Sequence, residues 1–319
     1  MKKSLRYIVV AAVMISCAAL FAGCSKKEET KESQTETIVE TETETETEME
    51  LVQVAADQNV VNIMLVGQDR RQNDSERQRS DSMILLTLNR SAQTLDMTSF
   101  MRDTYVEIPG WGGNRLNAAY VFGGIDLMNE TFLNNFGVKI DGVVEVDFYD
   151  FVEIIDEIGG VDIEIKEEEV SAVNSGISEV AKHLGEDVRK HQIAGAGLQH
   201  LDGLQALSYC RLRKVGNNDF ERTERQRRVV QEVFKQAKNM NTMQMLSLLD
   251  KTFELLNTNL TDDDLLNLMV EIMGMGVAEF ETHNIPEDAG YSSQSVDGMA
   301  VLVPDLEACK GLVQEIIGE

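Results

Sequence analysis

One helix that turns charged side chains toward the protein interior constrains this chain more than any other feature of its sequence. A stretch with good helix propensity runs from Asp219, which we expect to be the N-cap, to about Lys238. At helical spacing, Arg222 and Gln226 share one face of it with three apolar residues, Val229, Val233 and Ala237. Because the apolar residues must face a core, the same face directs Arg222 and Gln226 inward in the first turns.

These two side chains belong to a cationic segment in a strongly acidic protein. Residues 211–228 contain seven Arg or Lys against three acidic residues, whereas the whole chain of 319 residues carries a net charge of −26. Guanidinium groups suit bidentate capture of phosphate or carboxylate oxygens, and a helix N-terminus adds unpaired backbone N–H groups. From the residues alone, an anion-binding site and a helix face that pairs with neighbouring carboxylates both remain open.

The N-terminal part of the chain has the composition of an export signal followed by a tether. Basic residues precede a hydrophobic run at 7–23, which ends in a lipobox-like sequence before Cys24. We therefore expect residues 1–24 to be a lipoprotein-type signal or anchor with a lipid-modified Cys24, and an uncleaved signal anchor is the alternative. Residues 25–58 are rich in Glu and Thr and predict an acidic, disordered linker.

The remaining residues, 59–319, predict one α/β domain with a central mixed β-sheet flanked by helices. Strands are expected at 60–67, 83–89 and 94–101, and the short turn between the last two makes them antiparallel. If the first two strands are also antiparallel, the end of the first, the start of the second and the end of the third meet at one sheet edge. Ligands commonly bind at such an edge.

That edge would gather acidic and basic side chains in one place: Asp69, Arg70, Arg79, Asp81, Arg102 and Asp103. Crowded carboxylates need a cation or a shared proton, and Asp69 and Asp81 offer the hard oxygen ligands that Mg²⁺ or Mn²⁺ prefers. Arg79 and Arg102 would then neutralise the remaining phosphate charge. The alternative is a set of loop ion pairs that contribute little to stability.

Other segments allow broader expectations. The predicted helices at 118–136 and 148–158 could line a groove for a long apolar ligand, but their spacing fits an ordinary core equally well, and core is the preferred interpretation. Residues 175–197, with Gly and mixed charges, predict a variable loop or insertion near the site. Residues 241–319 predict two Leu/Met-rich helices and a last helix at 305–317.

Cysteine and histidine usage predicts neither a disulfide framework nor a zinc site. Two of the four cysteines lie within the first 24 residues, which leaves Cys210 and Cys309. These two could pair only if the fold brings them together. The four histidines have no zinc-ligand spacing, and the sequence contains no Walker A or G-x-S-x-G motif.

Eight short motifs in order, between about residues 61 and 235, carry a family resemblance. They are VGQDR at 66–70, RSDS at 79–82, MRDTYVEIPG at 101–110, RLNAAY at 115–120, GGVDI at 159–163, LDGLQAL at 201–207, RLR at 211–213 and DFERTERQ at 219–226. Each is weak alone, but together the chain resembles the LytR-CpsA-Psr family of cell-wall glycopolymer transferases. The lipobox departs from the transmembrane anchor that is usual in this family.

The resemblance implies a specific function. Family members are membrane-tethered, extracytoplasmic α/β proteins that use Mg²⁺ to move a glycan phosphate from an undecaprenyl-pyrophosphate carrier to a peptidoglycan sugar hydroxyl. By matching motifs, Asp69 and Asp81 would hold the metal. The matched pyrophosphate-binding residues are Arg79, Arg102, Arg211, Arg213, Arg222 and Gln226, with Arg70 and Arg225 in the same motifs. Asp103 is a further candidate base for the transfer.

The expected partners follow from that function. They are the undecaprenyl-pyrophosphate-linked glycan, peptidoglycan and the outer face of the cytoplasmic membrane, with no nucleic acid. The sequence leaves open whether the glycopolymer is teichoic acid, capsular polysaccharide or another wall glycan. Two other functions stay possible: a hydrolase that cleaves the same lipid pyrophosphate, and a non-catalytic lipoprotein that binds anionic polymers.

Overall fold

A computed structural model describes most of the chain beyond the predicted linker. The described residues are 54, 58–68, 79–213, 215–216, 218–277 and 280–318. The predicted signal, Cys24, and the site candidates Asp69 and Arg70 lie outside the described residues. Within the described part, no helix combines the length and the apolar character needed to cross a membrane.

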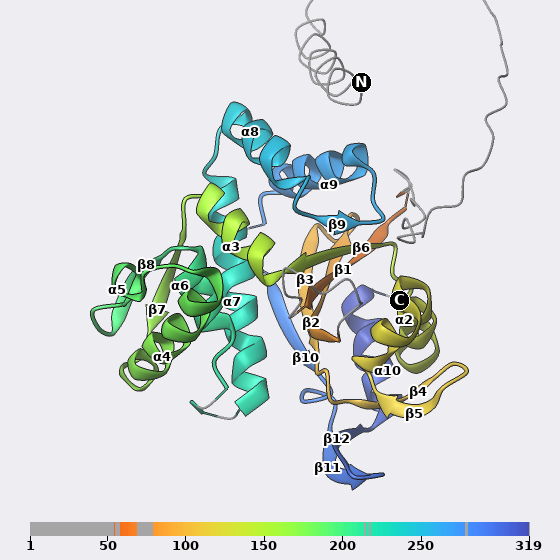
Figure 1. Ribbon diagram of the computed structural model, residues 1–319. Helices are drawn as coiled ribbons and strands as arrows, with labels where there is room; N and C mark the ends of the chain where they lie inside the picture. The colour runs from red at the N-terminus through yellow and green to blue at the C-terminus, as the bar shows by residue number, and fades with distance from the viewer. Residues whose placement is uncertain are drawn as a thin grey trace, which may run out of the picture. The chain divides into compact units, whose positions relative to one another are not determined.

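A six-stranded mixed sheet lies at the centre of the folded domain (Figure 1), in the order β10-β3-β2-β1-β6-β9. Its strands are β1 (Val60–Gln68), β2 (Ser80–Asn89), β3 (Thr94–Phe100), β6 (Gly142–Asp147), β9 (Asn257–Thr258) and β10 (Glu281–Ile285). Strand β2 is antiparallel to both β1 and β3, as the sequence predicts. The pairs β1–β6 and β3–β10 are parallel. The α/β class with a central mixed sheet is therefore confirmed.

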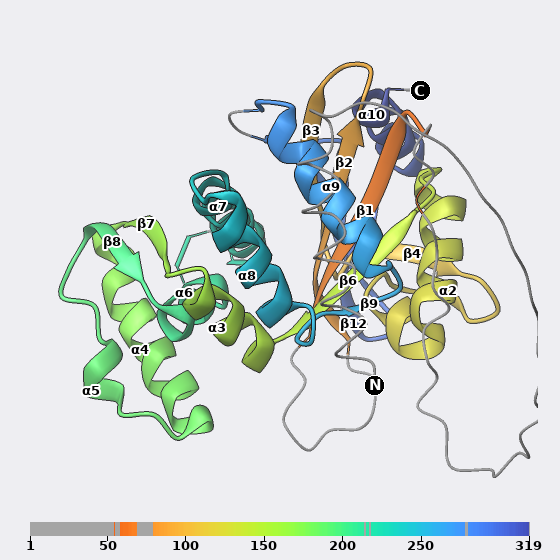
Figure 2. The ribbon, with the colours of Figure 1, turned by 90° about the horizontal axis from the view of Figure 1, so that it is seen from above.

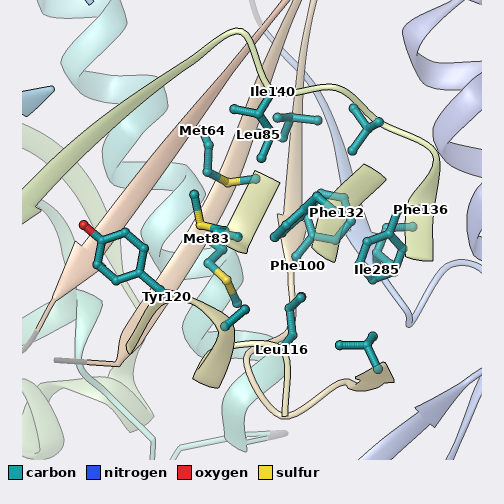
Figure 3. Close-up of a cluster of buried hydrophobic side chains, with 14 of the residues drawn as sticks. Met64, Met83, Leu85, Phe100, Leu116, Tyr120, Phe132, Phe136, Ile140 and Ile285 are labelled. Carbon is teal, nitrogen blue, oxygen red and sulfur yellow. The ribbon is translucent and has the colours of Figure 1, made fainter. Parts of the chain in front are cut away.

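Helices cover both faces of this sheet (Figures 1 and 2). Helices α2 (Ala118–Phe136) and α10 (Leu306–Ile317) lie on one face, and α7 (Asn218–Lys238) and α9 (Asp262–Gly274) lie on the other. On the α2 face, the Phe100 ring contacts the rings of Phe132 and Phe136 with centroid distances of 4.8 and 5.0 Å (Figure 3). Helix α2 is thus part of the core, which was the preferred of its two interpretations.

A further apolar cluster lies beside α7, and the elements that build it stand away from the sheet (Figure 2). It is built from α3 (Phe148–Glu157), β7 (Val161–Ile165), α4 (Glu167–Leu184), α5 (Val188–His191), β8 (Gly197–Leu201) and α6 (Gly203–Cys210). We call these elements the side lobe. The chain leaves the sheet at the end of β6, builds the lobe, and returns through α7.

The prediction of a loop at 175–197 is wrong for the first half of that range, because α4 continues through Leu184. Its buried residues Val173, Ile177 and Val180 repeat at helical spacing and face the lobe's core. A glycine inside the helix is explained by close packing, since a Cβ on Gly176 would meet Ser208 of α6 at 3.4 Å. The polar composition hid this amphipathic pattern.

The C-terminal part contains the three predicted helices, α8 (Thr242–Thr252), α9 and α10, together with strands that were not predicted. Strand β10 extends the central sheet, and β11 (Tyr291–Val296) pairs with β12 (Met299–Pro304) as a hairpin. The hairpin turn uses Asp297 and Gly298, both at positive φ, which is a recognised hairpin signal in sequence. Cys210 and Cys309 are both free and buried, one in the lobe and one in the α2–α10 core.

Candidate active site

The strand ends predicted to meet at one sheet edge do so in the structure. Asp81 is the second residue of β2, and Arg102 follows β3 by two residues. Nη1 of Arg102 donates to Oδ1 of Asp81 at 2.7 Å, and Nη2 of the same guanidinium lies 3.1 Å from Oδ2 of Asp219. One arginine therefore joins the sheet edge to the beginning of α7.

Asp219 lies at the centre of the charged residues, a position that sequence reasoning missed. Helix α7 begins at Asn218, so Asp219 stands within its first turn rather than at the N-cap. Besides its contact with Arg102, its Oδ1 lies 3.5 Å from Nη1 of Arg222 and 3.9 Å from Nε of Arg213. One carboxylate thus holds three guanidinium groups together. The sequence signal was present, because Asp219 is one of only three acidic residues in the cationic segment.

Arg222 is the most deeply buried cation of this group, with 2% of the residue exposed. Its Nη2 donates to the backbone carbonyl of Asp81 at 3.3 Å, while its Nε is buried and has no hydrogen-bond partner among the described residues. The pKa of Arg222 is lowered to about 10, chiefly by burial and then by the neighbouring cations Arg102 and Arg213, while the carboxylates of Asp219 and Asp81 oppose the shift. Such a group is stabilised by an anion that reaches it.

An apolar cavity of about 480 Å³ extends from this charged cluster between the sheet and the side lobe. Its walls include Leu65, Ile84, Val144 and Val146 from the sheet, and Phe148, Phe151, Ala172, Val180 and Leu207 from the lobe. Its polar lining includes Asp81, Ser82, Glu179, Arg211, Arg213, Arg222 and Gln226. The arrangement suits a ligand that has a long apolar part and an anionic head.

Two of these polar residues are held by neighbours within the cavity wall. Gln226 accepts a hydrogen bond at its Oε1 from the hydroxyl of Ser82 at 3.0 Å. The guanidinium of Arg211 lies over the ring of Phe148, 4.6 Å from the centroid, and 3.5 Å from Glu179. The face of α7 predicted to turn inward therefore does line a cavity, through Arg222 and Gln226.

Three predicted site residues lie elsewhere. Asp103 pairs with Nε of Arg102 at 3.5 Å and with Nε of Arg115 at 3.3 Å, and it is absent from the cavity lining. Arg225 is buried in ion pairs outside the cavity lining. Arg79 is exposed at the residue before β2. The structure thus gathers Asp81 and the predicted pyrophosphate residues other than Arg70, Arg79 and Arg225.

A separate group of possible metal ligands lies far from this cluster. Among the described residues, Asp96, Glu281 and His283 are the one set of three carboxylate or imidazole groups whose ligand atoms lie within 4.8 Å of one another. They belong to β3 and β10, and Asp96 precedes Arg102 by six residues, or about 20 Å along an extended chain. This group is distinct from the metal site expected at Asp69 and Asp81.

Comparisons with known proteins were made for the sequence and for the fold. The profile of the LytR_cpsA_psr family matches residues 21–315. The polyisoprenyl-teichoic acid–peptidoglycan teichoic acid transferase TagU of Bacillus anthracis (strain CDC 684 / NRRL 3495) is 34% identical over 214 residues, which cover 65% of this chain and 63% of that protein. The transferase of the same description from Bacillus subtilis (strain 168), TagT, is 30% identical over 222 residues, covering 68% and 66%.

The chain spans less than two thirds of the length of either relative. Among solved structures, TagT bound to LIIa-WTA superimposes with a TM-score of 0.66 at 26% identity. That superposition covers 86% of this chain and 98% of the TagT chain, so the likeness extends over the sheet and the side lobe alike.

Proposed function

Because this chain belongs to the LytR_cpsA_psr family, we propose that it attaches a glycopolymer to peptidoglycan. The donor is an undecaprenyl-pyrophosphate-linked glycan, and the acceptor is a sugar hydroxyl of peptidoglycan. The names of the relatives, polyisoprenyl-teichoic acid–peptidoglycan transferases, support this assignment. The observation that carries it in this chain is the apolar cavity that ends in buried and half-buried guanidinium groups.

The two ends of the cavity match the two parts of such a donor. The polyisoprenyl tail occupies the apolar walls, where Phe148 and Phe151 face the strands β1 and β6. The pyrophosphate lies at the polar lining, where Arg213 and Arg222 neutralise its charge and Gln226 adds hydrogen bonding. An open Nε on buried Arg222 is the kind of donor that a phosphate oxygen satisfies.

The proposed transfer is a phosphoryl displacement. The acceptor hydroxyl oxygen forms a bond to the phosphorus attached to the glycan, and the bond from that phosphorus to the bridging oxygen breaks. Polyprenyl phosphate leaves, the glycan phosphate becomes a phosphodiester on peptidoglycan, and the hydroxyl proton passes to a carboxylate or to water. Such reactions depend on in-line positioning and on neutralising the equatorial oxygens. We assign this role to Arg213 and Arg222 of the polar lining, with Arg102 beside them through its bond to Asp81.

The residues at the cavity fit a divalent ion. Asp81 is a hard oxygen donor at the polar lining, and among the described residues its Oδ2 has a loose contact of 3.5 Å with Arg213, which leaves that oxygen able to accept a metal. We propose that Asp81 and Asp69 hold Mg²⁺ or Mn²⁺. When bound, the ion would supply further positive charge for the pyrophosphate.

We place the enzyme on the outer face of the cytoplasmic membrane, held there by a lipid on Cys24 or by a single N-terminal anchor. The lipobox-like sequence supports the first alternative. Globomycin, which inhibits lipoprotein signal peptidase, should cause a larger precursor to accumulate in cells. Unchanged mobility would contradict lipidation.

A transfer assay with the full chain tests the catalytic proposal. A polyisoprenyl-pyrophosphate glycan labelled in the sugar is incubated with peptidoglycan and Mg²⁺. We expect label to become insoluble with the wall and the Asp81→Ala variant to transfer far less. Label released as soluble glycan phosphate would indicate a hydrolase, and binding without turnover would indicate a polymer-binding lipoprotein.

A further inference from the structure

Arg225 is the largest fully buried side chain of the described protein, yet it does not line the cavity. Its Nε donates to Oε1 of Glu169 at 2.8 Å, and its Nη2 donates to Oε2 of Glu221 at 2.8 Å. Glu169 is itself fully buried. The guanidinium therefore has its charge balanced by protein carboxylates and does not need a ligand anion.

The other contacts of Arg225 are to the backbone that precedes α7. Its Nη1 donates to the carbonyl of Leu212 at 3.3 Å, and its Nη2 donates to the carbonyl of Val215 at 3.2 Å. These two carbonyls flank Arg213 in sequence. Residues 211–216, of which Lys214 lies outside the described residues, run from α6 toward α7 and carry both Arg211 and Arg213. This segment is thus bonded to one side chain on either side of Arg213.

Glu169, the buried carboxylate partner of Arg225, connects these contacts to α4, the helix on the far wall of the cavity. Oε2 of Glu169 accepts at 3.0 Å from the backbone N–H of Lys166, the residue that precedes α4. Three turns later the same helix presents Glu179 to the guanidinium of Arg211. Arg225 therefore links α4, the segment 211–216 and α7, which are three parts of the cavity's polar end.

We propose that Arg225 is a positioning residue, which holds segment 211–216 so that Arg211 and Arg213 face the pyrophosphate, and that Glu169 in turn fixes Arg225. This inference rests on the proposed function of the cavity. It gives Arg225 a different role from that of Arg222, one helical turn earlier, which turns its open Nε to the ligand. Both arginines belong to one motif, so the difference is visible only in the fold.

Lysine could not replace Arg225 in this role. Four of the five guanidinium N–H groups are used here, in four directions set by the planar fork. An ammonium group is a single point of charge and cannot reach two carboxylates and two carbonyls together. The Arg225→Lys variant keeps the net charge but should free the segment to move.

The experiment measures binding of farnesyl pyrophosphate and of farnesol to the full chain by calorimetry. Farnesol probes the apolar walls alone, whereas farnesyl pyrophosphate also probes the arginines. For Arg225→Lys we expect the dissociation constant of farnesyl pyrophosphate to rise about tenfold or more, since misplacing binding groups by about 1 Å can cost up to a hundredfold. Farnesol binding should stay within twofold, and amide hydrogen exchange should increase at 211–216.

Arg228 on the same helix provides a matched control. Its guanidinium bonds Glu224 and the hydroxyl of Tyr209 and makes no contact with the carbonyls of Leu212 and Val215. Arg228→Lys should leave both dissociation constants unchanged. If Arg225→Lys fails to fold, Glu169→Gln supplies the second test, since it keeps the shape and the bond to Lys166 while removing the charge that fixes Arg225.

The outcomes separate the two proposals. If the wild-type chain binds no farnesyl pyrophosphate, the proposed function of the cavity fails. If the wild-type chain binds it and Arg225→Lys binds it equally well with unchanged exchange at 211–216, the positioning role fails. The positioning role would also fail if Arg225→Lys weakened the binding of farnesol and of farnesyl pyrophosphate equally and lowered hydrogen-exchange protection throughout the protein. That result would mean that the ion pair of Arg225 only stabilises the fold.

Discussion

Replacing Arg222 by methionine should slow transfer strongly and stabilise the fold at the same time. The side chain is 98% buried by area, and its charge is balanced less well than that of a typical buried arginine. The fall of its pKa from the usual value of an arginine to about 10 corresponds to a free-energy cost of about 3 kcal/mol for keeping the guanidinium charged in the fold. Methionine removes that cost while filling similar space.

The net gain is smaller than the full cost, because methionine leaves the backbone carbonyl of Asp81 without the hydrogen bond that Arg222 donates, whereas the attraction of Asp219 is already included in the lowered pKa. Losing that hydrogen bond costs about 1 kcal/mol. We therefore expect Arg222→Met to raise the free energy of unfolding by about 2 kcal/mol, or Tm by about 4–8 °C for a domain of this size. Transfer should fall by about a hundredfold or more, the usual effect of losing one charge-stabilising donor.

The assay is urea unfolding of the full chain, with Arg225→Met as the contrasting variant. Arg225 is paired with Glu169 in the interior, so its removal leaves an uncompensated buried carboxylate and should cost about 3–5 kcal/mol. Two arginines three positions apart on α7 should therefore change stability in opposite directions. A loss of stability in Arg222→Met comparable to that in Arg225→Met would refute the reasoning.

Three further perturbations follow from the same structure. Ala172→Phe should fill part of the apolar cavity and weaken farnesyl pyrophosphate binding about tenfold in a calorimetric titration, while inorganic pyrophosphate binds unchanged. Burial raises the pKa of the Cys210 thiol to about 12, so the free energy of unfolding should fall as the pH rises from 9 toward 12. The Cys210→Ala variant should lose less stability over this range, as measured by unfolding at a series of pH values. Gly203→Ala would bring a Cβ to 2.1 Å from the carbonyl oxygen of Val152, and thermal unfolding should show a destabilisation of about 1–3 kcal/mol because α3 and α6 must move apart.

Local patterns in the sequence were sufficient to predict the strands and the helix face that carry the site residues. Branched apolar runs bounded by a short turn predicted β1, β2 and β3, and their antiparallel order placed Asp81 beside Arg102. Helical spacing predicted that Arg222 and Gln226 turn inward. These are short-range properties, fixed by side-chain period and by turn length.

The cavity itself depends on long-range packing that the sequence pattern does not encode. Phe151 of α3 and Val180 of α4 line the cavity only because the side lobe folds back beside α7. The same packing separates Arg225 from Arg222, although motif matching placed both at the pyrophosphate. Helix α4 was missed because its apolar positions are spaced among polar residues and a glycine.

The most direct test of the central claim is a crosslinking measurement on the full chain. A polyisoprenyl pyrophosphate analogue with a photoreactive group in its tail is irradiated with the protein, and the labelled peptides are identified by mass spectrometry. The account predicts labelling of Phe151, Val180 and Leu207 on the cavity walls, suppressed by excess unlabelled farnesyl pyrophosphate. Labelling confined to exposed apolar residues such as Leu133 of α2, without such competition, would contradict it.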